Sequence, residues 1–365
     1  MEAATRSFEE ALRLLGRYVP RQFVVFLCLF LWEAVVQMVH TILPRWSIGL
    51  RPEDPSQEEL LCWRLHSRLA HGYWFVRSKV HVLWTHLRGM NQAECYPPTL
   101  ELAQAYSEHA PAMTLIPYFD RGVAYAQKSF EIRKSLGDVW GQGQSLSYHS
   151  VVLFAGSRFA ECVEKGRQAI RLLERTGDFW EVHIARYQVA AALYRNGELP
   201  SAIQLARRNY LSGIKLGDEQ ASGISLDVWS RAAGGKLPAK IVTDEVARTR
   251  PDAQGAAQSM LAEGVRLIAA EKMAEAETVF ETALQIAAKA GVMNAYISPN
   301  LAWLATARRL QLDRYRGYLP ARRRKLLRLA ERAARNSVRV ARWFQNDLPH
   351  ALRELGIVMI YRGRT

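Results

Sequence analysis

Bulky, small and turn-forming residues recur at a fixed distance along the middle of the chain. Gly-Asp pairs close the tripeptides that begin at positions 136, 176 and 216, a constant step of 40 residues. Large apolar residues share one position of the repeat, and small residues follow three positions later: Phe119, Phe159 and Leu199, then Gly122, Cys162 and Ala202. Self-similarity at this interval predicts one supersecondary unit that occurs several times.

The spacing inside each unit predicts two α-helices. A small side chain at a fixed place lets a second helix approach, and large apolar side chains beside it fill the groove between them. Gly137, Gly177 and Gly217 fall where a helix must end, because glycine adopts the left-handed C-terminal conformation without a Cβ clash. The aspartate after each glycine can cap the next helix. Such pairs bury their apolar faces by stacking, so we expect a solenoid.

The same spacing returns near the C-terminus after an interruption. It fits Gly264, Leu267, Met273, Ala276, Phe280, Ala283 and Gly291. Between the two arrays, Gly234-Gly235, Pro238 and Pro251 predict a spacer with at most one short helix. The expected organisation is a truncated second helix (1–21), an inserted apolar helix and linker (22–56), a repeat array (57–233), a spacer (234–255) and a second array that ends in a half repeat (256–365). Half repeats at both ends predict a fragment or detached homologue of a longer protein.

The pattern small–x2–apolar–x8–small–x3–Phe–x2–Ala resembles the tetratricopeptide repeat, although that repeat usually has about 34 residues. Four stretches resemble the repeat regions of large bacterial signalling ATPases, including serine/threonine kinase–ATPase fusions: 96–113, 136–146, 171–190 and 218–229. The resemblance implies an all-α solenoid, a right-handed superhelix of helix pairs with repeats of about 40 residues. It implies a bacterial, cytoplasmic scaffold that binds protein or peptide segments, with any catalytic domain in a longer parent protein.

In the register of that repeat, the first helix of each pair faces a concave groove. The positions that face the groove are Gln144, Ser147, Tyr187, Tyr194 and Arg195, called the groove residues below. Tyrosine and arginine are typical anchors of protein interfaces. The resemblance therefore implies that these side chains contact a partner.

One apolar run lies outside the repeat. Residues 22–43 have the length of a membrane-spanning helix and stand between Arg21 and Arg45. Glu33, Gln37 and His40 interrupt the run, and their spacing of four and three puts them on one helical face. An unpaired glutamate in lipid is costly. Two environments stay open for this helix: a buried or interfacial site in a soluble protein, or contact with a membrane that would make the chain a membrane-associated adaptor.

The net charge of +14 raises the question of an anionic partner. Arginines recur at steps of four, four, three, four and three along one helix face, called the basic face below: Arg324, Arg328, Arg332, Arg335, Arg339 and Arg342. A solvated outer surface explains this pattern. The alternative is a docking site for an acidic protein segment, a phosphate-bearing partner or, less favoured, a nucleic acid.

The sequence predicts no catalytic, metal or cofactor site. Gly141-x-Gly143 lacks the strand and third glycine of a dinucleotide-binding turn, and Gly234-Gly235-Lys236 lacks the phosphate-loop spacing. The histidine pairs 66/71 and 81/86 are five residues apart, which is the wrong spacing for two metal ligands on one helical face. The four cysteines form no CxxC pair, which fits a reducing compartment. The 49% of hydrophobic residues excludes a disordered chain.

Overall fold

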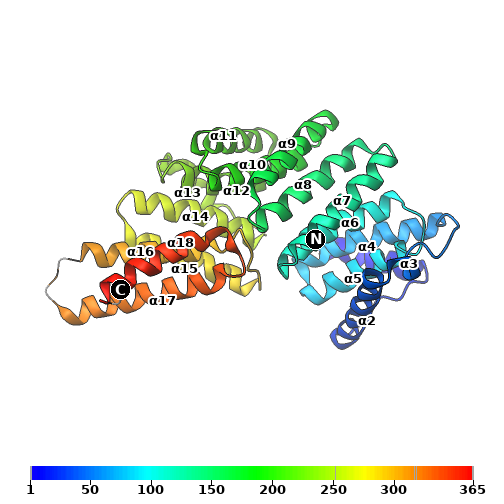
Figure 1. Cartoon of the computed structure of the whole chain (residues 1–365), viewed down its shortest axis with the longest axis horizontal. Helices are drawn as coiled ribbons and strands as arrows, with labels where there is room; N and C mark the ends of the chain where they lie inside the picture. The colour runs from blue at the N-terminus through cyan, green and yellow to red at the C-terminus, as the bar shows by residue number, and fades with distance from the viewer. Residues whose placement is uncertain (1, 251, 316, 318, 364–365) are drawn as a thin grey trace. The chain divides into compact units, whose positions relative to one another are not determined.

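The computed structural model describes residues 2–250, 252–315, 317 and 319–363. In that part of the chain every regular element is a helix, which confirms the all-α prediction. The chain divides into two compact units. Unit 1 comprises Met1–Ala110 and Ala124–Ser145, and unit 2 comprises Pro111–Val123 and Leu146–Thr365. Figure 1 shows the helices in chain order.

Unit 1 is built around the packed helices α2 (Phe23–Ile42), α4 (Gln57–Val76) and α5 (Lys79–Ala93). Its other helices are α1 (Glu2–Leu14), α3 (Pro44–Ser47) and most of α6 (Leu100–Ala112) and α7 (Phe119–Ser135). Helix α4 packs on α5, and both α1 and α2 pack on this pair. Leu69, Tyr73, Trp84 and Met90 form the centre of the core. Among the described residues, α2 alone is long and apolar enough to cross a membrane.

Unit 2 stacks helix pairs in sequence order. After most of α8 (Val139–Ala155) come α9 (Phe159–Thr176), α10 (Phe179–Arg195), α11 (Leu199–Leu216), α12 (Glu219–Ala232), α13 (Ala239–Ala247), α14 (Ala253–Ala269), α15 (Met273–Lys289), α16 (Pro299–Arg314), α17 (Pro320–Ala341) and α18 (Leu348–Tyr361). Short 3-10 turns lie at Met113–Leu115 (η1) and Gln345–Asp347 (η2). Each helix from α9 to α12 and from α14 to α18 contacts the next one, and α12 contacts α14 directly. This is the stacked architecture that the repeat predicts.

The predicted helix ends are confirmed at two repeat junctions. Gly177 and Gly217 adopt left-handed C-cap conformations, with φ of 75° and 68°. The carboxylate of Asp178 accepts a hydrogen bond from the Glu181 amide, and Asp218 does the same for Ala221. These interactions satisfy backbone groups that the helix ends would leave unpaired. The repeat length is therefore fixed by local backbone chemistry.

The small and bulky positions meet as expected. Cys162, Ala202 and Ala276 are buried, and Phe280 on α15 lies against Gly264 on α14. A Cβ atom at position 264 would stand 2.2 Å from Cε1 of Phe280. Glycine there lets the phenyl ring occupy the space between the two helices. The spacer 234–255 begins with Gly234 and Gly235, both at positive φ, and contains α13.

Candidate functional site

The basic face runs along α17 and is exposed to solvent. All six of its arginines are exposed, whereas Ala330, Ala334, Val338 and Ala341 on the opposite side are buried. Apolar contacts with α16 and α18 hold the buried side in place. The helix therefore presents its charge outward because its small residues pack inward.

Few acidic side chains balance this charge. Arg335 pairs with Glu331 at 2.9 Å, and Arg339 donates to the Asn336 side chain at 2.8 Å. The side chains of four more arginines have no hydrogen bond or ion pair within the part of the chain that the structure describes: Arg324, Arg328, Arg332 and Arg342. By contrast, Arg308 on the neighbouring helix α16 is paired with Glu277 at 2.7 Å. The unpaired charge of this region is thus concentrated on α17.

The first two groove residues lie inside α8 and are buried. The Gln144 side chain accepts a hydrogen bond of 3.0 Å from Arg133 on α7. Ser147 has no exposed surface. Both side chains take part in the packing between helices.

The other three groove residues meet within unit 2, at α10. The Tyr187 hydroxyl donates to Asp227 on α12 at 3.0 Å and accepts from Gln258 on α14 at 2.5 Å. Burial raises the pKa of Tyr187 well above its ordinary value, so the hydroxyl keeps its proton. The guanidinium of Arg231 lies 4.8 Å from the ring centre of Tyr194. Tyr194 thus lies beside an arginine of α12 that the repeat register did not single out.

Later segments of the same unit cover these side chains. Arg195 donates to Asp347 of η2 at 2.6 Å, and Asp347 also accepts from Ser298 at 3.0 Å. The ring of Tyr296 stacks on Phe154 with centroids 5.6 Å apart. The chain's own residues therefore occupy the positions that the resemblance assigns to a partner. An external ligand at Arg195 would have to replace Asp347.

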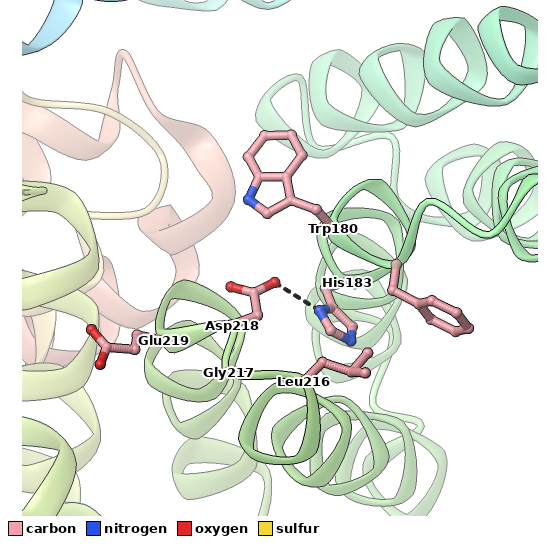
Figure 2. Close-up of a pocket in the computed structure, with 7 residues that line it drawn as sticks. Trp180, His183, Leu216, Gly217, Asp218 and Glu219 are labelled. Atoms are coloured by element: carbon pink, nitrogen blue, oxygen red, sulfur yellow. Dashed lines mark hydrogen bonds and ion pairs between the residues drawn. The ribbon is translucent and has the colours of Figure 1, made fainter. Parts of the chain in front are cut away.

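An open pocket of about 590 Å³ lies between α10 and the α11–α12 junction. It is lined by Phe179, Trp180, His183, Leu216, Gly217, Asp218 and Glu219. Figure 2 shows the contact between His183 and Asp218. The Nδ1 atom of His183 lies 2.7 Å from the Oδ2 atom of Asp218. The other ring nitrogen, Nε2, lies 2.8 Å from the Ser212 hydroxyl. The spacing of the repeat did not predict that Ser212, His183 and Asp218 would contact one another.

The Ser212–His183–Asp218 chain has the order of a hydrolase triad, but its surroundings differ. Burial alone would raise the pKa of Asp218, yet hydrogen bonds from His183 and the Ala221 amide hold it below its ordinary value. Ser212 lies within α11, where backbone amides bond to carbonyls of the same helix. Acyl transfer needs amides aimed at the developing oxyanion. The three side chains connect α10 to α11 and α12 through these two contacts.

Comparisons with known proteins give no family assignment. No family model matches the chain, and no curated protein matches it. The crystal structure of aspartyl phosphate phosphatase F from Bacillus subtilis is similar with 13% sequence identity and a TM-score of 0.40, over 97% of this chain and 88% of that one. A likeness of this size carries no argument about activity. The evidence for the fold, an all-helical stack of repeated helix pairs, is the order of the helices and their contacts in the described residues.

Proposed function

We propose that this chain is a non-catalytic scaffold that binds a protein partner, and that the basic face contacts an acidic segment of that partner. The observation that carries the proposal is the row of exposed arginines along α17, four of which have no side-chain partner among the described residues. Like charges one helical turn apart destabilise a helix by a few tenths of a kcal/mol per pair. Carboxylates arranged along the same face would remove this repulsion and form charge-assisted hydrogen bonds.

Exposure distinguishes the basic face from the groove residues. Arg324, Arg328 and Arg332 are free to bind, whereas Arg195 is already paired with Asp347. The basic face also lacks exposed aromatic side chains between its arginines, with Trp343 beyond its end. Aromatic stacking platforms are typical of single-stranded nucleic-acid binding. An acidic protein segment is therefore favoured over nucleic acid.

Charge reversal of the basic face tests this proposal. The variant Arg328→Glu/Arg332→Glu should bind an oligoglutamate peptide at least about tenfold more weakly, because it loses two charge-assisted contacts and gains repulsion. Fluorescence anisotropy at several salt concentrations measures the affinity. The control variant Arg167→Glu/Arg207→Glu makes the same charge change at exposed positions on α9 and α11.

Two results would contradict the proposal. Equal losses in both double variants would show that net charge alone attracts the peptide. Tighter binding of duplex DNA than of the peptide, with a steep salt dependence, would instead indicate a polyanion binder.

We further propose that the chain works in the bacterial cytoplasm as the repeat module of a signalling ATPase or kinase. The support is the resemblance of residues 96–113, 136–146, 171–190 and 218–229 to such modules. The coding sequence on either side of the chain tests this context. An in-frame nucleotide-binding or kinase domain would support it, and flanking stop codons together with an unrelated upstream gene would contradict it.

The pocket at His183 tests whether the chain lacks catalytic activity. We expect no labelling of Ser212 by a fluorophosphonate probe, because the backbone amides next to Ser212 bond to carbonyls within α11 and are not aimed at a developing oxyanion. Intact-protein mass spectrometry and hydrolysis of p-nitrophenyl acetate are the two measurements. Labelling that disappears in both Ser212→Ala and Asp218→Asn would establish a serine hydrolase and refute the scaffold proposal.

A further inference from the structure

The apolar helix α2 is oriented with its polar residues toward the protein. Glu33, Gln37 and His40 are the residues that interrupt the apolar run, and all three are buried. Their spacing places them on one side of the helix. The sequence left two environments open for residues 22–43, and this orientation bears directly on the choice between them.

Each residue of this polar stripe has a partner in unit 1. Glu33 accepts from Arg88 at 2.9 Å and from the Asn91 side chain at 2.8 Å. The Gln37 amide donates to the Tyr125 hydroxyl at 2.9 Å.

The third contact completes the attachment. Nδ1 of His40 lies 2.6 Å from Oε2 of the buried Glu94. Hydrogen-bonded partners remove most of the cost of burying polar side chains. The polar stripe therefore binds α2 to the rest of unit 1 and is shielded from solvent.

The opposite side of α2 is apolar and uncovered. Its exposed large hydrophobic residues, with those of the segment that follows, are Phe23, Val24, Leu27, Leu31, Trp32, Val35, Met38, Val39, Ile42, Leu43 and Trp46. Leu31 and Trp32 are 54% and 61% exposed, and Trp46 is 81% exposed. Glu33 is the one acidic residue of the helix, and it is buried. A contiguous apolar surface of this kind marks an interaction site.

The positive charges at the two ends of this apolar surface favour an anionic partner. Arg21 and Arg45 are exposed at the two ends of the helix. Two copies packed through α2 would bring arginines of the same sign together in either orientation, at a cost in energy. An anionic lipid surface complements both arginines, and tryptophans such as Trp46 favour the headgroup boundary. Because the polar stripe stays on the protein, the helix can only lie flat on a bilayer.

We propose that α2 docks unit 1 on an anionic membrane surface, with its apolar side in the headgroup–acyl boundary and its polar stripe held by α5 and its neighbours. This inference is independent of the proposed scaffold function, because it rests on a different surface. It places the chain on a membrane through α2, whereas the proposed partner-binding surface is the basic face on α17.

Vesicle binding tests the proposal directly. Cys28 is exposed on α2, whereas Cys62 and Cys162 are buried, so an NBD label can be placed on Cys28 in a Cys95→Ala background. Vesicles of phosphatidylcholine mixed with phosphatidylglycerol should raise and blue-shift the NBD emission and should co-sediment with the protein. Vesicles of phosphatidylcholine alone should do so far less.

Three variants separate the possible results. Leu31→Asp/Val35→Asp should weaken vesicle binding at least about 100-fold, since two apolar side chains no longer enter the bilayer. Arg21→Gln/Arg45→Gln, which leaves the packed side of α2 untouched, should reduce the preference for phosphatidylglycerol about 30-fold. The control Leu211→Asp/Ile214→Asp makes the same change at exposed apolar positions of α11 and should bind like the wild-type chain.

Several outcomes would overturn the proposal. Equal binding to both kinds of vesicle would exclude an anionic lipid surface. Equal weakening by the α11 control would exclude α2 as the docking helix. Absence of vesicle binding, together with a dimer in sedimentation velocity that Leu31→Asp/Val35→Asp dissociates, would assign the apolar side to a second copy of the chain.

Discussion

Asp227→Ala is expected to lower the free energy of unfolding of unit 2 by about 3–5 kcal/mol, because it leaves a buried charge without its partner. Asp227 and Arg231 are both almost fully buried, and Oδ1 of Asp227 lies 2.6 Å from Nε of Arg231. The second carboxylate oxygen accepts from the Tyr187 hydroxyl. One substitution therefore leaves both Arg231 and Tyr187 without the carboxylate that they share.

The arginine cannot escape this cost by losing its proton. Burial alone would lower the pKa of Arg231, but Asp227 and the nearby tyrosines raise it above its ordinary value. Removal of Asp227 takes away the largest of these favourable interactions. Even so, the ordinary pKa of a guanidinium is too high for deprotonation at neutral pH. The charge stays, and the folded state carries its desolvation energy.

Urea denaturation followed by circular dichroism measures this loss. The control is Asp244→Ala, which removes the carboxylate of another pair at the same i,i+4 spacing, 3.9 Å from Lys240. Because that pair is exposed, the control should cost at most about 1 kcal/mol. Similar losses in the two variants would contradict the importance of burial at Asp227.

The parts of the fold that depend on neighbouring residues could be predicted from the sequence. Gly177 and Asp178 define a helix end and the next helix start through backbone conformation and capping, both of which are local. The pairing of Gly264 with Phe280 also follows from the repeat, because adjacent helices in a solenoid contact each other in sequence order.

What covers a surface could not be predicted in the same way. The register predicts that Arg195 lies on an inner face, but its partner Asp347 is 152 residues away in the sequence. Nothing in the spacing of one repeat specifies which distant segment returns to cover it. The groove residues thus remain a hypothesis about binding, and their burial by the chain's own segments is what the structure adds.

The orientation of α2 is an intermediate case. Glu33, Gln37 and His40 were predicted to share a face, but the sequence of the helix itself does not say which way that face points. A signal exists elsewhere: Arg88, Asn91 and Glu94 recur at steps of three and form a matching polar stripe at α5. Two polar stripes of complementary hydrogen-bonding groups predict a contact when they are considered together.

Phe280→Ala is expected to destabilise unit 2 by about 3–5 kcal/mol, because it leaves a cavity where a fully buried ring stood. The ring fills the space opposite Gly264. Whether Gly264→Ala raises or lowers the free energy of unfolding should therefore depend on whether the ring is present. In the wild-type chain, Gly264→Ala should cost about 1–3 kcal/mol, because the new methyl group overlaps the ring. In the Phe280→Ala background the same change should stabilise the helix by up to about 1 kcal/mol.

A double-mutant cycle in urea measures this change of sign as a coupling energy between positions 264 and 280. Gly356→Ala is the matched control, since a Cβ atom there meets nothing within 4 Å on its side of α18. That control should be neutral or slightly stabilising in both backgrounds, as expected for alanine in place of glycine within a helix. Additive effects at positions 264 and 280 would show that the small and bulky positions of the repeat do not determine how α14 and α15 pack.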